Sequence, residues 1–97
     1  MKQAKTQKLD ELVALYLKQT GLDRKFKEME ACRVWPEVVG QAIATRTREV
    51  TMTGGKLFVR FTSSVVRSEM AMVKEGVIRA LNDRLGEDVV TDIIYRS

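Results

Sequence analysis

The stretch Ser64–Leu85, SVVRSEMAMVKEGVIRALNDRL, decides the fold. Its apolar residues recur every three or four positions, which places them on one face of an α-helix. Ser63 or Ser64 can cap the start, because a side-chain oxygen there accepts from a free backbone N–H, and Gly86 suits the left-handed residue that ends a helix. A helix of about 22 residues, roughly 33 Å long, can cover a small sheet. Its apolar stripe is Val66, Met70, Val73, Val77, Leu81 and Leu85.

Length and composition indicate one small domain that spans residues 1–97, with residues 1–5 expected to be disordered. The chain is 44% hydrophobic and 31% charged, with one proline, which is typical of a globular protein with a modest core. No run reaches the roughly 20 apolar residues of a membrane span, and the N-terminus has no apolar signal segment. Cys32 is the single cysteine, so no internal disulfide forms, and we expect a cytoplasmic protein.

The composition argues against an enzyme. Histidine is absent, which excludes histidine-based triads, bases and metal ligands. The sequence has no glycine-rich phosphate loop, since Gly54-Gly55 lacks the other residues of such a motif. We therefore expect no catalytic residue, no metal and no cofactor. The net charge of +4 is compatible with nucleic-acid binding and does not establish it.

Two helical segments precede the strands. Residues 6–20 carry a stripe that Gly21 ends, formed by Leu9, Leu12, Val13, Tyr16 and Leu17. Leu15 lies beside this stripe, and two interpretations stay open: with Leu12 and Tyr16 it forms a patch for a partner, or it adds cover to the core.

The second helical segment, from residue 22, places at turn spacing Leu22, Phe26, Met29, Ala31 or Cys32, and Trp35. We expect Pro36 to break the helix and to start a short new one over residues 36–44, with Val38, Val39 and Ile43 inward. Trp35 is expected in the core, with base stacking as the alternative.

After Ala44 the pattern changes to that of strands. Residues 45–53 are rich in Thr, Gly54-Gly55 marks a tight turn, and residues 56–62 place Leu57, Val59 and Phe61 on one face. Val50 and Met52 are expected inward in the first strand, so its early half must leave the core or carry a bulge. Residues 89–96 form a third strand, whose inward face is expected to be Val89, Thr91, Ile93 and Tyr95. The order α-α-β-β-α-β predicts an α+β fold, a three-stranded sheet covered by helices on one face.

An ordered series of short motifs resembles the DciA-like family, once catalogued as a domain of unknown function. The series covers the chain from about residue 8 to its end and includes WPEVVGQAIA at 35–44, GKLFVRFTSS at 55–64, Glu69-Met70, Leu81-Asn82, Leu85-Gly86 and IIYR at 93–96. The resemblance implies a KH-like fold and a non-enzymatic role in bacterial DNA replication, as a loader or operator of the DnaB-type replicative helicase that also binds DNA. Better-known members carry a long flexible extension, so a chain that stops at Ser97 is expected to be a short form without it. It also lacks the G-x-x-G loop with which KH domains clamp a nucleic-acid backbone.

Two functional hypotheses follow. The first is a replication adaptor that binds helicase and single-stranded DNA through cations around an exposed aromatic ring, with the candidate residues Arg46, Arg48, Lys56, Phe58, Arg60 and Arg67. The ordinary alternative is a solvated sheet face on which the first helix covers Phe58. The second hypothesis is a protein–protein interaction module with little or no nucleic-acid binding, which docks through Leu12, Leu15 and Tyr16.

Overall fold

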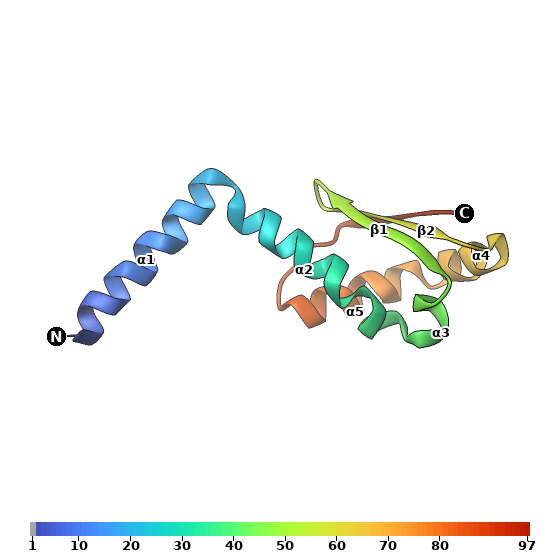
Figure 1. The fold of residues 1–97 in the computed structure, drawn as a ribbon, viewed down its shortest axis with the longest axis horizontal. Coiled ribbons are helices and arrows are strands. Elements are labelled where there is room, and N and C mark those ends of the chain that lie inside the picture. The colour runs from blue at the N-terminus through green and yellow to red at the C-terminus, as the bar shows by residue number, and fades with distance from the viewer. Residues whose placement is uncertain (1) are drawn as a thin grey trace.

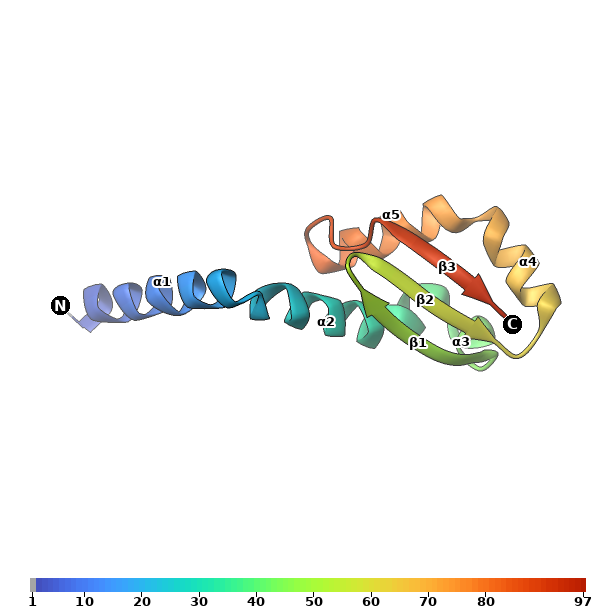
Figure 2. The same ribbon diagram turned by 90° about the horizontal axis from the view of Figure 1, so that it is seen from above.

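The structure is a computed structural model that describes the backbone of residues 2–97 and the side chains of residues 8–97. Met1 and the side chains of residues 2–7 lie outside this description, so the expected disorder of residues 1–5 stays a prediction. Figures 1 and 2 show an α+β fold with α1 Lys2–Thr20, α2 Leu22–Val39, α3 Gln41–Ala44, β1 Thr47–Thr53, β2 Lys56–Phe61, α4 Ser64–Met72, α5 Lys74–Leu85 and β3 Asp92–Arg96. This is the predicted fold class, and it is consistent with a KH-like arrangement.

The three strands form one mixed sheet in the order β1-β2-β3. β1 and β2 are an antiparallel hairpin, and its turn uses Gly54 at φ 58° and Gly55 at φ 82°, positive values that favour glycine. β3 runs parallel to β2, so the chain crosses over through α4 and α5 before it returns to the sheet. Figure 1 shows α2 and α5 on one side of the sheet, which leaves the other side of the sheet open.

The core lies between the sheet and these helices. Leu57, Val59 and Phe61 are at most 1% exposed, as the alternation in the sequence predicted. Trp35 is 1% exposed and lies near Phe61 and Tyr95, with ring centroids 6.4 and 6.5 Å away. The prediction of a core tryptophan is confirmed, and the 35–44 stretch packs against the 57–61 strand across the core. The other buried residues are Ala31, Val34, Val66, Met70, Leu81, Val90 and Ile93.

A β-bulge resolves the pattern of β1. The pairing with β2 shifts between Thr47 and Glu49, so Arg48 is an extra residue without a cross-strand partner. Thr47 and Val50 both turn toward the helices, and the two exposed residues between them stay out of the core. The Nε1–H of Trp35 donates to Thr47 Oγ1 at 3.2 Å, which anchors this end of the strand. The inward placement of Val50 and Met52, both half-buried, is confirmed.

The prediction of one continuous helix over residues 64–85 is wrong. The helix is interrupted at Val73, which is 52% exposed with φ −113° and ψ 16°. Each step of four residues turns the apolar stripe by about 40° around a straight axis, so a long run of such steps leaves its face. The interruption lets α4 pack against β3 and α5 against α2 with their own stripes. Both predicted caps are confirmed: Ser63 Oγ accepts from Val65 N at 3.2 Å, and Gly86 has φ 79°.

Pro36 does not break the second helix, contrary to the sequence prediction. α2 runs through Pro36 to Val39 and ends at Gly40, whose φ is 87°. Pro36 lies in the last turn, where its missing N–H removes a single helical hydrogen bond, and it is exposed. The expected short helix is reduced to α3, and Val38, Val39 and Ile43 are half-buried against the core as predicted.

α1 does not cover the core, which corrects the more conservative interpretation of its apolar stripe. The molecule measures 59 × 22 × 20 Å, and Figure 2 shows α1 extending away from the sheet. Gly21, at φ 78°, lies between α1 and α2. The stripe of α1 is solvent-exposed at Leu9, Leu12, Val13 and Tyr16. The exposed apolar surface continues onto α2 through Leu22, Phe26 and Met29.

β3 starts later than predicted because a side chain holds the segment before it. The Asn82 amide donates to Val90 O at 2.9 Å, and its Oδ1 accepts from the backbone N–H groups of Val89 and Val90 at 3.1 and 2.8 Å. This clamp buries Val90, which the strict alternation had assigned to the other face, while Thr91 is exposed. Ile93 and Tyr95 face the helices as predicted, buried and half-buried respectively.

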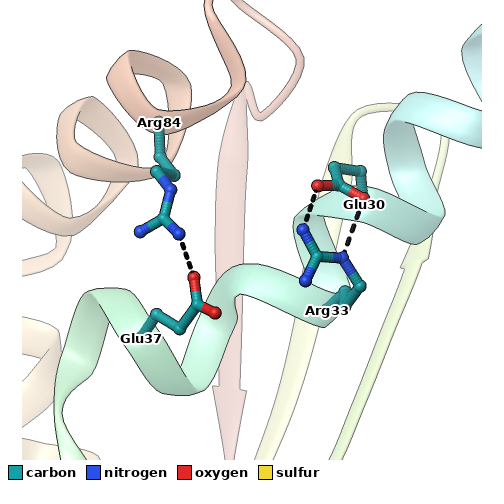
Figure 3. A network of polar contacts seen from close by, with 4 residues as sticks. All are labelled: Glu30, Arg33, Glu37 and Arg84. Atoms are coloured by element: carbon teal, nitrogen blue, oxygen red, sulfur yellow. Dashed lines mark hydrogen bonds and ion pairs between the residues drawn. The ribbon is translucent and has the colours of Figure 1, made fainter.

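Ion pairs reinforce the helix layer at its surface. In Figure 3, Arg84 of α5 pairs with Glu37 of α2, and Arg33 donates to Glu30 one turn before it. The Arg33 hydrogen bond lowers the pKa of Glu30. Exposed pairs of this kind contribute little stability, so the buried apolar residues hold α2 against α5. Within the described part of the chain, no helix is long and apolar enough to cross a membrane.

Candidate nucleic-acid interface

One face of the sheet lacks a covering helix, and we call it the open face. Its residues alternate with those that point into the core, and the strand register aligns them in three rows. Figure 2 views the sheet from this side, with β1, β2 and β3 in front of the helices. The rows are Glu49–Arg60–Arg96, Thr51–Phe58–Ile94 and Thr53–Lys56–Asp92.

A shallow hollow of about 250 Å³ lies on the open face, close to the lower limit of small-molecule pockets. The half-buried ring of Phe58 contributes an apolar floor, and the guanidinium groups of Arg60 and Arg96 come from adjacent strands in the same row. The hollow is lined by Glu49, Thr51, Phe58, Val59, Arg60 and Arg96. An aromatic ring beside two planar cations is a suitable surface for an unstacked base and its phosphate.

The charge on the open face is predominantly positive. Asp92 is turned to the sheet edge, where Lys74 of α5 pairs with it at 3.0 Å. The Lys74 hydrogen bond, followed by the hydrogen bond from the Ile93 backbone N–H, lowers the pKa of Asp92. Lys56, Arg60 and Arg96 are all exposed, and among residues 8–97 none of them forms an ion pair within 4.0 Å.

The structure brings together part of the predicted nucleic-acid site. Lys56, Phe58 and Arg60 follow one another on the open side of β2. Arg48 is the exposed bulge residue at the start of β1. Arg46 precedes β1 and donates to Ala42 O at 3.0 Å, while its own carbonyl accepts from Thr62 N at 2.9 Å, so it lies near the end of β2.

Arg67 does not join this group. It belongs to α4, it is half-buried, and its Nε is buried without a hydrogen-bond partner among the described residues. The sequence interpretation missed Arg96, which the structure places beside Arg60. Because Ile93 and Tyr95 face the helices, alternation along the strand could have placed Arg96 on the opposite face. Only the parallel pairing of β3 with β2 shows that Arg96 lies in the same row as Arg60.

Phe58 and Trp35 have opposite environments. The alternative in which the first helix covers Phe58 is wrong, because α1 extends away from the sheet. Trp35 is enclosed in the core, which removes it as a base-stacking platform. Phe58 is thus the aromatic side chain of the sheet that faces solvent.

The predicted partner-binding residues lie on a separate surface. Leu12, Leu15 and Tyr16 are 63%, 52% and 60% exposed on α1, well away from the sheet. Exposed apolar side chains that gather on one helix mark an interaction site more often than isolated ones do. The open face and α1 therefore offer two chemically distinct surfaces, one cationic and one apolar. In the part of the chain searched for metal sites, no group of three acidic, cysteine or histidine side chains converges.

The comparisons with known proteins identify the family. The sequence model of one family, described as "Dna[CI] antecedent, DciA", matches residues 8–94, nearly the whole chain and the span covered by the short motifs. No curated protein matches the chain. The chain therefore belongs to the DciA family, whose members are non-enzymatic loaders of the replicative helicase DnaB in the initiation of DNA replication.

Proposed function

We propose that this protein is a replication adaptor that binds the DnaB-type helicase and single-stranded DNA, with the open face as the DNA contact. The observation that supports this proposal most strongly is that Arg60 and Arg96 lie in one row beside the half-buried ring of Phe58. Such an adaptor would act in the bacterial cytoplasm.

The chemistry of this surface suits a single strand. Each base stacked on an aromatic ring contributes about 1–3 kcal/mol, and any base can stack because each has a π-face. In a duplex the bases are already stacked, so Phe58 has no free base to receive. The arginines and Lys56 lie close enough to the ring to neutralise the phosphates on either side of a stacked nucleotide.

A charge-reversal pair tests the DNA contact. The double substitution Arg60→Glu and Arg96→Glu is expected to remove most affinity for an oligothymidylate in fluorescence anisotropy. The salt dependence should also weaken, since each lost phosphate contact lowers the slope of log K against log salt by about 0.7. The matched control is Arg24→Glu with Arg79→Glu, which changes the net charge equally at exposed positions on α2 and α5. An equal loss in both variants, or no DNA binding at low salt, would contradict the proposal.

The second candidate function, an interaction module without DNA binding, is favoured by the exposed apolar surface of α1. We propose that Leu12, Leu15 and Tyr16 contact the helicase, because they form an apolar patch of the kind that a partner protein covers. Leu12→Gln with Tyr16→Gln should abolish co-purification with the organism's DnaB-type helicase. The matched control is Glu11→Gln with Lys18→Gln on the same helix, which should leave co-purification intact.

The two candidate functions predict different combinations of the DNA-binding and helicase co-purification results. Helicase binding together with salt-sensitive DNA binding supports the adaptor. Helicase binding without DNA binding supports the interaction module. If the folded protein does not co-purify with helicase at all, the role inferred for it from the family is wrong.

A further inference from the structure

Glu49 stands out on the cationic open face because its carboxylate lines the hollow without a cation held against it. It pairs across the strands with Arg60, yet among residues 8–97 no ion pair within 4.0 Å and no hydrogen bond involves its side chain. A surface that served only to attract phosphates would gain nothing from a carboxylate here, since it repels them. Its position therefore points to a ligand group that donates hydrogen bonds.

The register defines where such a group would lie. Phe58 pairs with Thr51, so Glu49 is its diagonal neighbour on β1, within reach of a flat ring stacked on Phe58. Arg60 lies next to Phe58 on the same side of β2, and Arg96 lies beyond it on β3. A base stacked on Phe58 can thus turn one edge to Glu49 and the adjoining edge to Arg60, while its phosphate lies toward Arg96.

The side chains of Glu49 and Arg60 favour the same base, each through a different edge. A carboxylate accepts two parallel hydrogen bonds from the N1–H and N2–H₂ donors that adjoin on guanine. Cytosine and adenine present one amino group next to a ring acceptor, and thymine presents a single N–H between two carbonyls. Arginine in turn makes its commonest base contact with O6 and N7 of guanine. The donor edge of guanine is free in a single strand and paired in a duplex.

We propose that the hollow binds a guanine base of single-stranded DNA, with Glu49 as the residue that distinguishes it from the other bases. This inference rests on the proposed DNA-binding function and adds a base preference to it. It applies to one nucleotide of the bound strand, so the remainder of the strand binds without regard to sequence.

Fluorescence anisotropy with a labelled oligothymidylate of about 12 nucleotides tests the preference when one central thymidine is replaced. A central deoxyguanosine should tighten binding about fivefold or more, the low end for a bidentate base contact. Deoxyinosine lacks the N2 amino group, so a central deoxyinosine should lose most of this gain in affinity. A central deoxyadenosine or deoxycytidine should bind little more tightly than plain oligothymidylate.

The variants Glu49→Gln and Glu69→Gln separate a base contact from a general charge effect. Glu49→Gln should bind plain oligothymidylate more tightly, because a repulsive charge is gone, and should lose the guanine preference. Glu69→Gln removes an exposed carboxylate of α4 outside the hollow and should retain the preference. Equal affinity for all oligonucleotides, or a preference that survives Glu49→Gln, would overturn the inference while the DNA-binding function stands. If no oligonucleotide binds at low salt, both proposals are wrong.

Discussion

At the scale of single residues, the Asn82 side chain fixes the backbone segment that leads into β3. Its side chain makes three hydrogen bonds to the backbone of residues 89 and 90, and Val90 is 2% exposed. Asn82→Ala should lower the free energy of unfolding by about 2–3 kcal/mol, since buried backbone groups lose their partners. Urea unfolding checks this, with Asp83→Ala as the exposed neighbour that changes stability by less than about 0.5 kcal/mol. An Asn82→Ala protein as stable as the native one would show that the clamp is unimportant.

Tyr95 gives stability a dependence on alkaline pH. Burial raises the pKa of Tyr95 to about 12, while the ordinary tyrosine value is about 10. The unfolded chain therefore loses this proton first, so the contribution to stability is full below about pH 10 and is lost as pH rises to about 12.

The substitution Tyr95→Phe isolates this effect. The Tyr95 hydroxyl has no hydrogen-bond partner among the described residues, so its removal leaves no other group unpaired. Urea midpoints measured from about pH 9 to about pH 12 should fall less steeply in the variant than in the native protein. Identical pH profiles would mean that the Tyr95 hydroxyl is accessible to water in the folded protein.

At the scale of elements, α1 contributes no buried side chain to the core among the described residues. A chain that begins at Gly21 should therefore keep its free energy of unfolding within about 0.5 kcal/mol. Its helical circular dichroism should fall because α1 is lost. The control is Leu81→Ala, at a position that is 0% exposed. It should lower the free energy of unfolding by about 2–5 kcal/mol and so show that the assay detects damage to the core. A truncated chain destabilised as much as Leu81→Ala would place α1 against the body in solution.

Element boundaries were predictable where local chemistry determines them. Gly54-Gly55 can adopt positive φ values that most residues avoid, and Ser63 can satisfy free N–H groups at a helix start. The interruption at Val73 carries no glycine or proline signal. It arises because α4 and α5 pack against different neighbours, which is a tertiary effect.

The orientation of α1 was not predictable for a related reason. An amphipathic pattern shows that a helix has an apolar face, but it does not show whether that face packs on its own chain or on another. In the same way, Arg96 joins Arg60 only once β3 is known to pair parallel to β2. The hairpin residues Lys56, Phe58 and Arg60, in contrast, share one face by alternation alone.

At the scale of the whole molecule, the architecture separates two surfaces. The sheet presents an open cationic face with an aromatic ring, and α1 carries an apolar patch at the other end of a molecule 59 Å long. A small adaptor with this arrangement could hold a nucleic-acid strand and a protein partner at once without steric conflict. The same separation would make the two proposed activities independently removable by mutation.

The most direct test of the open face is a titration of the labelled protein with an oligothymidylate of about 12 nucleotides, followed through its backbone amide NMR shifts. The amide signals of Glu49, Phe58, Arg60 and Arg96 should move together and saturate at one DNA concentration, while those of α1 stay in place. Shifts that gather on α1, or an unchanged spectrum at low salt, would contradict the assignment of the open face to DNA.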